Sequence, residues 1–238
     1  MTLADLAAYE PVIRAPIEGS YRGYTIKAMA PPSSGALTAI QILRMLERFP
    51  IGDAGAGYGF GSVKTLNVMA EAMRVAFSDR ADWMADADFV PVPTRGLIDP
   101  AYLSGRSALI TPGTRRTPDP LPGDPRPFQT AGLAPQCAHA RPAPQTGPEN
   151  GTTHFSVVDR WGNVVSYTNT IESGYGIGVF AGYQRADGSK RSHGFLLNNE
   201  LTDFNTTPST HRVTDEVGYN DVQPGKRPRS SMVPTMLF

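Results

Sequence analysis

Apolar residues in the first third of the chain recur at the spacing of an α-helix. They occupy Leu37, Ile40, Leu43 and Leu46. Side chains three or four residues apart lie on one face of a helix, and such a stripe has to pack on another layer, for which we expect a sheet. The pattern predicts one helix over 34–48 and a second over 62–79. Ser33 and Ser34 offer hydroxyl groups that would cap the start of the first helix.

Two other segments have the composition of β-hairpins. Residues 12–30 are rich in β-branched and aromatic side chains around two glycines, where the chain can turn. Residues 152–159 and 163–172 flank a short turn whose glycine, Gly162, can adopt a positive φ. The sequence therefore predicts one hairpin early in the chain and one in its second half.

The second hairpin brings particular side chains together if its strands pair symmetrically about Trp161. Thr152 then lies opposite Thr170, with Cβ atoms about 5 Å apart. Because side chains alternate along a strand, Glu172 shares a face with Thr170, and a one-residue bulge would remove this arrangement. We therefore expect two facing threonine hydroxyls with a carboxylate one step beyond them.

The stretch between the two halves is rich in proline and poor in large apolar residues. Residues 112–148 hold ten of the 22 prolines and four glycines. A segment of this composition buries too little surface to offset the entropy lost on ordering. We therefore expect a linker over 112–151, which separates residues 1–111 from a β-rich part over 152–238.

Composition excludes several classes of protein. The 22 basic and 22 acidic residues cancel, and no basic cluster provides the attraction to phosphate on which nucleic-acid binders rely. Cys137 is the only cysteine, which excludes an internal disulfide and a multi-cysteine metal site. No apolar run approaches the roughly 18 residues that span a bilayer, and the first residues lack the features of a signal peptide. We expect a globular chain with no membrane segment and no nucleic-acid partner.

The junction between linker and hairpin is where we expect the chemistry. A threonine hydroxyl is a weak nucleophile that needs a base, and of the four histidines only His154 is close to Thr152 in sequence. Cleavage of the Gly151–Thr152 bond would expose an α-amine, with a pKa of about 8, on the residue that carries the hydroxyl. Base and nucleophile would then be preassembled, and the uncleaved chain would be inert. On spacing alone, an ordinary strand threonine is the favoured alternative.

Four motifs in order give the chain a family resemblance. Residues 151–159, followed by 161–166, resemble the start of the small subunit of gamma-glutamyltranspeptidases. Residues 197–204 and 226–232 are similar to the segments of that family that bind the substrate amine and carboxylate, and 31–35 resembles part of its large subunit. The resemblance implies an N-terminal-nucleophile hydrolase. It also implies an α+β fold, the four-layer αββα sandwich, which would be incomplete in this chain.

Carried onto the matching positions, the resemblance assigns roles to seven residues. It makes Thr152 the nucleophile and Thr170 the hydroxyl that orients it. The α-ammonium of the substrate would contact Glu172, Glu200 and Asp203, and its α-carboxylate would contact Ser230 and Ser231. An ammonium is satisfied by several acceptors with a negative charge, and a carboxylate by hydroxyl donors. Without the resemblance, the two later acids would be surface residues and the serine pair a turn.

The resemblance also implies an activity and partners. Thr152 would attack glutathione or another γ-glutamyl compound and pass the γ-glutamyl group to water or an acceptor amino acid, with no metal or organic cofactor. Residues 1–111 and 152–238 would belong to the large and small subunits of a cleaved heterodimer, which would be periplasmic or secreted. The acceptor and the share of hydrolysis are left open.

Two alternatives to this activity remain. One is a glutaryl or cephalosporin-type acylase, or another amidohydrolase of the same superfamily, and the other is a non-catalytic remnant. In the family, a carboxylate-binding arginine would precede Met1 and an oxyanion-binding glycine pair would follow Phe238, so we expect this stretch alone to be inactive. Tyr219 is either a lid residue over the site or, as its spacing from Asp203 favours, a packed loop residue.

Overall fold

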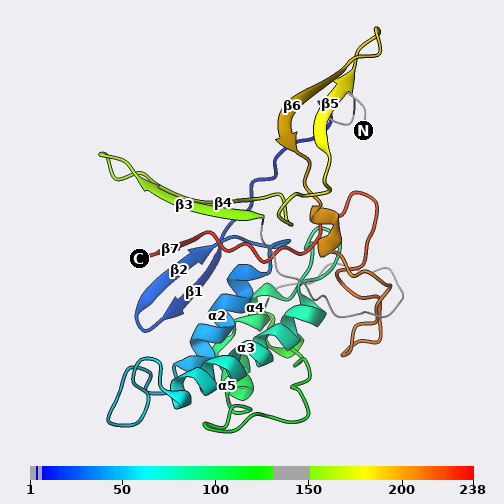
Figure 1. Ribbon diagram of the computed structural model, residues 1–238. Coiled ribbons are helices and arrows are strands. Elements are labelled where there is room, and N and C mark those ends of the chain that lie inside the picture. The colour runs from blue at the N-terminus through cyan, green and yellow to red at the C-terminus, as the bar shows by residue number, and fades with distance from the viewer. Residues whose placement is uncertain (1–3, 5–6, 131–150) are drawn as a thin grey trace.

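The computed structural model describes residues 4, 7–130 and 151–238. Its helices pack against one another, and two long hairpins project away from them (Figure 1). The helices are α2 (Gly35–Leu46), α3 (Val63–Trp83), α4 (Thr94–Leu97) and α5 (Pro100–Ser107). The two helices expected from the apolar pattern are therefore confirmed as α2 and α3.

The two long helices begin in different ways. At the start of α3, Ser62 Oγ accepts a hydrogen bond of 3.2 Å from the Thr65 N–H, which is a side-chain cap. Ser34 precedes α2 but makes no such cap, because its Oγ donates to the carbonyl oxygen of Ser230 at 2.8 Å. The capping role predicted for Ser34 is therefore wrong, and its hydroxyl joins α2 to a distant segment instead.

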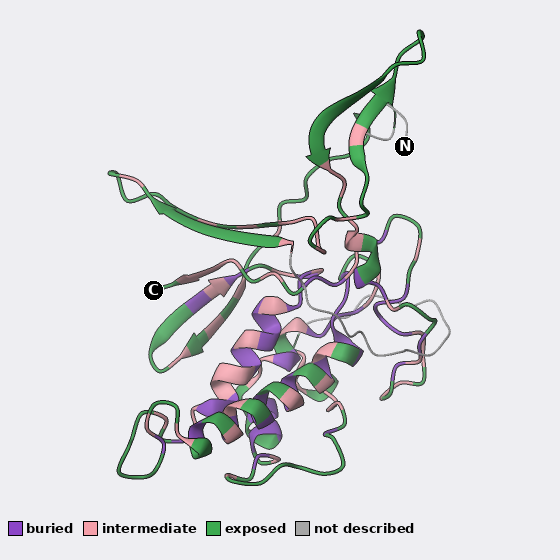
Figure 2. Cartoon of the chain, viewed as in Figure 1, coloured by how far each residue is buried: buried purple, intermediate pink, exposed green. Residues whose placement is uncertain are grey.

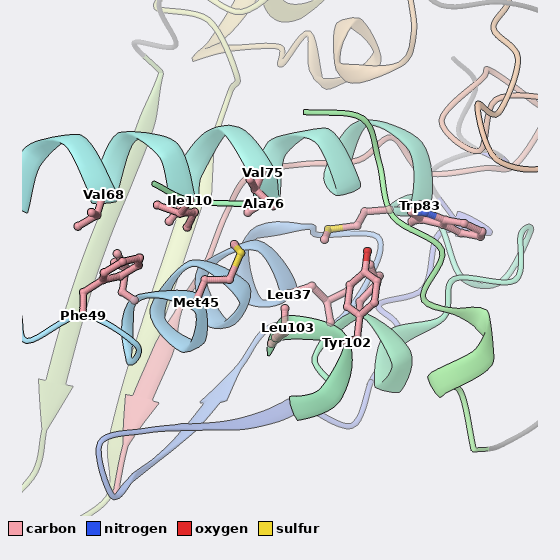
Figure 3. Packing of buried hydrophobic residues seen from close by; sticks show 14 of the residues in the cluster. Leu37, Met45, Phe49, Val68, Val75, Ala76, Trp83, Tyr102, Leu103 and Ile110 are labelled. Carbon is pink, nitrogen blue, oxygen red and sulfur yellow. The ribbon is translucent and has the colours of Figure 1, made fainter. Parts of the chain in front are cut away.

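The apolar core lies between α2, α3 and α5. Buried side chains from these helices meet there, among them Leu37, Met45, Val68, Val75 and Leu103 (Figure 3). Trp83, at the end of α3, is the largest side chain that is fully buried. The apolar stripe of α2 thus packs on two neighbouring helices as well as on the sheet described next.

A three-stranded antiparallel sheet covers another side of α2. Its strands are β1 (Ile17–Tyr21), β2 (Tyr24–Ala28) and β7 (Thr235–Leu237), in the order β1-β2-β7. The first two form the hairpin expected within 12–30, and β7 joins it from the far end of the chain. Ile40 of α2 packs on Ile26 and Ala28 of β2, so the predicted contact between helix and sheet is confirmed.

Two further hairpins form two-stranded sheets of their own. One pairs β3 (Thr152–Val158) with β4 (Val164–Thr170), and the other pairs β5 (Phe180–Gln184) with β6 (Lys190–Leu196). Both lie largely exposed (Figure 2). In the first hairpin Thr152 pairs with Thr170 and Val158 with Val164, which confirms the register predicted from the turn.

The described residues confirm an α+β fold but do not complete a sandwich. Their strands form one three-stranded sheet and two separate two-stranded sheets rather than two stacked layers. Within residues 7–130 and 151–238, the four-layer arrangement implied by the resemblance is therefore only partly built, with the helices and the β1-β2-β7 sheet as its most complete portion.

The first half of the predicted linker, residues 112–130, packs against the helices. The Trp83 Nε1–H donates to the carbonyl oxygen of Gly123 at 2.7 Å, and the Gly123 N–H donates to the Asp79 carboxylate at 2.9 Å. The expectation that this composition leaves the segment unpacked is wrong here, because its backbone groups bond to buried polar side chains. The remainder of the linker, 131–150, lies outside the described residues.

Candidate active site

The seven residues to which the resemblance assigns roles line one cavity of about 140 Å³. They come from three places in the chain: the facing ends of β3 and β4, the 3-10 turn over Glu200–Asp203, and the segment that leads into β7. Met232 is the eighth lining residue. At roughly 30 Å³ per water molecule, the cavity has room for a small polar ligand. The structure thus brings all seven side chains together, and their roles remain predictions.

A larger groove adjoins this cavity. Its volume is about 1030 Å³, and it shares four lining residues with the smaller cavity: Thr170, Glu200, Ser230 and Met232. Lys27 and Met29 of the β2 region line its other side. A ligand whose polar end fills the small cavity can therefore extend into the groove.

Thr152 and Thr170 face each other at the ends of β3 and β4. Their Oγ1 atoms are 2.9 Å apart. Thr170 Oγ1 also accepts from the Glu172 N–H at 2.7 Å and can donate to the Gly151 carbonyl oxygen at 3.4 Å. Either hydroxyl can be the donor of the pair, and when Thr170 donates to Gly151 its single proton leaves Thr152 as the donor to Thr170.

The peptide bond that precedes Thr152 is held by two hydrogen-bond donors. The carbonyl oxygen of Gly151 accepts from the Ile171 N–H at 3.2 Å as well as from Thr170. The Gly151 N–H in turn donates to the carbonyl oxygen of Glu172 at 3.0 Å. Donors that polarise a carbonyl oxygen favour attack on its carbon atom. This geometry fits a bond that is to be cleaved from the Thr152 side.

Glu172 reaches the cavity by a route that differs from the predicted one. β4 ends at Thr170, and Glu172 lies beyond the strand with φ 69, in the left-handed region. The strand alternation used to place its carboxylate therefore does not apply. The carboxylate is held instead by a hydrogen bond from Asn199 Nδ2, and Asn199 Oδ1 also accepts from the Ser173 N–H at 3.0 Å.

Asn199 is a residue that sequence reasoning missed. It belongs to the 197–204 motif, which was the available signal, but no role was assigned to it. The same motif supplies Glu200 and Asp203 to the cavity, and Asp203 is buried. Three carboxylates around a small cavity favour a positively charged group such as an ammonium over an anion, because their negative charges repel an anion and their oxygen atoms offer several acceptors.

The Ser230–Ser231 segment is clamped to the start of α2. The Ser230 carbonyl oxygen accepts from the Ser34 N–H at 2.9 Å and from the Ser34 hydroxyl. Ser33 Oγ donates to the carbonyl oxygen of Met232. Two consecutive serines in one half of the chain therefore fix the backbone on either side of Ser231.

Arg229 anchors the same segment from its other side. Its buried guanidinium donates to the carbonyl oxygens of Arg80 at 2.7 Å, Ala81 at 3.2 Å and Met84 at 3.3 Å, at the end of α3. Cations are favoured where a helix leaves carbonyl groups without partners. Burial, together with the positive charge of the nearby Arg80, lowers the pKa of Arg229 to about 9. No local sequence pattern indicated this contact.

His154 and His211, two of the three histidines that the structure describes, make their contacts away from Thr152. His154 Nδ1 bonds to Thr168 Oγ1 at 2.7 Å, in a cross-strand pair two residues along from Thr152 and Thr170. His211 is buried, and its ring contacts Trp83 and Tyr219. Burial lowers the pKa of His211 to about 4, so the ring is neutral. Tyr219 is likewise buried in this aromatic cluster, which confirms the packed-loop alternative over the lid.

Among residues 7–130 and 151–238 no group of three or more histidine, cysteine, aspartate or glutamate side chains is arranged to hold a metal ion. None of the described helices combines the length and apolar character needed to cross a membrane.

The fold is shared with a solved structure of a cephalosporin acylase from Bacillus halodurans. The match covers 100% of this chain and 34% of the acylase chain, with a TM-score of 0.67 and 22% sequence identity. At this identity the likeness concerns the fold alone, and it places the chain in the α+β class.

The sequence comparisons identify the family. The family model for gamma-glutamyltranspeptidase matches residues 1–238, and the chain belongs to the gamma-glutamyltranspeptidase family. It is 40% identical over 238 residues to the glutathione hydrolase proenzyme of Bacillus subtilis (strain 168), covering 100% of this chain and 36% of that protein. It is 37% identical over 235 residues to the acylase ACY 1 proenzyme of Pseudomonas sp. (strain SE83), covering 99% and 34%. The chain therefore spans about a third of the length of these relatives.

Proposed function

We propose that this chain contributes the catalytic threonine and the amino-acid pocket of a γ-glutamyl-transferring hydrolase. The observation that carries the proposal is the convergence of Thr152, Thr170, three carboxylates and two serine hydroxyls on one small cavity. Membership in the family and the name of the Bacillus subtilis relative support the same activity.

The first proposed step is self-cleavage between Gly151 and Thr152. Thr152 Oγ1 attacks the Gly151 carbonyl carbon, whose oxygen is already held by the Ile171 N–H and the Thr170 hydroxyl. The C–N bond breaks, the nitrogen takes up the proton, and water hydrolyses the resulting ester to give a Gly151 carboxylate. Thr152 is then left with a free α-amine that serves as its base.

The second proposed step is acyl transfer from a γ-glutamyl amide. The α-amine of Thr152 accepts the hydroxyl proton while Oγ1 bonds to the γ-carbonyl carbon, and the proton passes to the departing amine as the C–N bond breaks. Water or an acceptor amine then cleaves the ester and restores the hydroxyl. The Thr170 hydroxyl, 2.9 Å away, keeps Oγ1 directed at the substrate.

Selectivity for a glutamyl group would follow from the two kinds of lining residue. Glu172, Glu200 and Asp203 provide acceptors and negative charge for an α-ammonium, whereas Ser230 and Ser231 provide hydroxyl donors for an α-carboxylate. A glutaryl group lacks the ammonium and would offer these carboxylates no positive charge. The cavity therefore favours an α-amino substrate over the acylase substrates of other family members.

The same proposal divides the chain into parts. Residues 1–111 would belong to the large subunit, 112–151 to the segment that ends at the cleavage site, and 152–238 to the small subunit. The hydrogen bonds between Ser33–Ser34 and the 230–232 segment would then hold the two subunits together after cleavage. Glutathione or another γ-glutamyl compound would be the donor, and water or an amino acid the acceptor.

Mass spectrometry of the complete gene product tests the cleavage. Wild type is expected as two pieces, with Thr152 as the first residue of the smaller one, whereas Thr152→Ala should remain a single chain. Thr152→Ser, which keeps a hydroxyl, is the matched control and should still cleave. A wild-type protein that is fully active while its chain is intact would refute the mechanism.

A pair of anilide substrates tests the specificity. The cleaved protein should release 4-nitroaniline from γ-glutamyl-4-nitroanilide and act at least about tenfold more slowly on glutaryl-4-nitroanilide, because the glutaryl group offers no positive charge to the three carboxylates, of which Asp203 is buried. The reverse preference would assign the protein to the acylases. Activity on neither substrate, in a protein that cleaves itself, would contradict the proposed reaction.

A further inference from the structure

Arg80, on α3, bonds to two of the serines that shape the cavity. Its Nη2 donates to Ser231 Oγ at 2.8 Å, and its Nε donates to Ser34 Oγ at 2.8 Å. We propose that Arg80 is a positioning residue that directs the Ser231 proton toward the substrate carboxylate and gives that end of the cavity its positive charge. This inference rests on the proposed function and extends it to a residue outside the cavity lining.

The direction of the proton follows from the chemistry of the two groups. A guanidinium has donors and no acceptor, so Ser231 Oγ has to be the acceptor in the contact with Arg80. The Ser231 proton is then not used by Arg80 and is available for an anion in the cavity. Accepting a charged hydrogen bond also polarises the hydroxyl, which makes it a stronger donor.

The second branch of the guanidinium fixes the backbone beneath the serine pair. Ser34 Oγ accepts from Arg80 and donates to the Ser230 carbonyl oxygen at 2.8 Å. The rigid, planar guanidinium of an arginine can donate to both serines at once. The ammonium group of a lysine, at the end of a flexible side chain, would hold a serine less firmly. The guanidinium also lies over the Phe77 ring, 5.4 Å from its centroid, which restrains its plane.

Charge gives the arrangement its second effect. The charged side chains that line the cavity are all carboxylates: Glu172, Glu200 and Asp203. Without a nearby cation, an anionic group would be repelled by this lining. Arg80 supplies that cation behind Ser231, so that one end of the cavity suits an ammonium and the other a carboxylate.

Two substrates that differ only in the α-carboxylate test the inference in the cleaved gene product. With γ-glutamyl-4-nitroanilide, Arg80→Met should lower kcat/KM by about 10- to 100-fold, the range expected for one charge-assisted hydrogen bond, chiefly through a higher KM. With 4-aminobutyryl-4-nitroanilide, which lacks that carboxylate, the change should be less than about threefold. Arg80→Lys should fall between wild type and Arg80→Met, since it keeps the charge but not the planar guanidinium.

A matched control and a double variant distinguish positioning of Ser231 by Arg80 from a general loss of protein stability. Arg74→Met makes the same substitution on the same helix at an arginine that pairs with Glu71 and Asp119, away from the serines, and should leave both substrates nearly unaffected. In a Ser231→Ala background, Arg80→Met should cost little more, because its partner is already gone. If Arg80→Met prevents self-cleavage, the same comparison is made with Arg80→Lys.

The results distinguish failure of this inference from failure of the proposed function. Equal losses on both substrates, or losses that add to those of Ser231→Ala, would mean that Arg80 only stabilises the fold and would overturn the inference. A wild-type protein with no γ-glutamyl activity would overturn the proposed function itself, and the inference with it.

Discussion

Asp79 holds together a buried polar network beneath the predicted linker, and its removal should be costly. The carboxylate accepts from Arg106 Nη2 at 2.7 Å, from the Tyr102 hydroxyl at 2.8 Å and from the Gly123 N–H at 2.9 Å. Asp79 and Arg106 are both buried. Burial raises the pKa of Asp79 although Arg106 opposes the shift, which means that the ionised carboxylate is tolerated only because its partners surround it.

The expected magnitude follows from the partners that Asp79→Ala would strand. Arg106 would keep a buried charge with no carboxylate opposite it, and breaking a buried pair in this way costs about 3–5 kcal/mol. Replacing both residues, in Asp79→Leu with Arg106→Met, removes the charge as well and should cost much less than the two single changes combined. The exposed pair of Arg74 and Asp119 is the control, and Asp119→Ala should cost about 0–1 kcal/mol.

Hydrogen exchange of the gene product in added urea, followed by mass spectrometry, measures the loss of stability segment by segment. In Asp79→Ala, amides from α3 and from the 121–124 segment should exchange faster by the factor that corresponds to the lost stability, and the Gly123 amide should lose its acceptor. The double variant should recover most of the protection in α3. Single losses that simply add in the double variant would show that the pair is not coupled, and the account of this network would be wrong.

Three further outcomes are expected. Burial lowers the pKa of His211 from 6.5 to about 4, so that as the pH falls the unfolded chain takes up a proton on this ring before the folded chain does. The contribution of His211 to the free energy of unfolding is therefore complete above about pH 6.5 and decreases, by on the order of 3 kcal/mol, toward pH 4. Urea denaturation of His211→Phe at several pH values should lack this part of the decrease. Thr170→Val should slow self-cleavage at least about tenfold in a mass-spectrometric time course, whereas Thr170→Ser should not; equal rates would exclude a role for that hydroxyl. Gly35→Ala would place a Cβ 2.7 Å from the Ser231 carbonyl oxygen, and it should raise KM for γ-glutamyl-4-nitroanilide and lower the melting temperature. Gly105→Ala is the control: its Cβ would meet nothing within 4 Å, so neither KM nor the melting temperature should change.

Local patterns predicted the elements that depend on local spacing. The apolar stripe of α2 and the pairing of Thr152 with Thr170 both follow from periods that the sequence displays directly, 3.6 residues for a helix and 2 for a strand. The same reasoning failed at Glu172, because it extended the strand past its end. A positive φ at a residue other than glycine has no signal in the sequence.

Contacts between distant segments were not predictable in this way. Ser34 was assigned to a helix cap because a hydroxyl before a helix suits that role, yet its partner lies 196 positions away. Arg80 and Ser231 are separated by 151 positions, and nothing near either residue points to the other. The linker was judged by its apolar content, whereas in 112–130 it is held by backbone bonds to groups such as Asp79.

Two contacts join the early and late parts of the chain: the hydrogen bonds from Ser33 and Ser34 to the 230–232 segment, and the pairing of β2 with β7. These contacts affect how the protein refolds before and after cleavage. As a single chain, the protein only has to close a loop to bring these parts together. Once the bond ahead of Thr152 is opened, the same parts would belong to separate polypeptides that meet by diffusion after any unfolding. The precursor would therefore be the form that folds readily, and a mature molecule that unfolds would regain its shape only at a rate that depends on concentration.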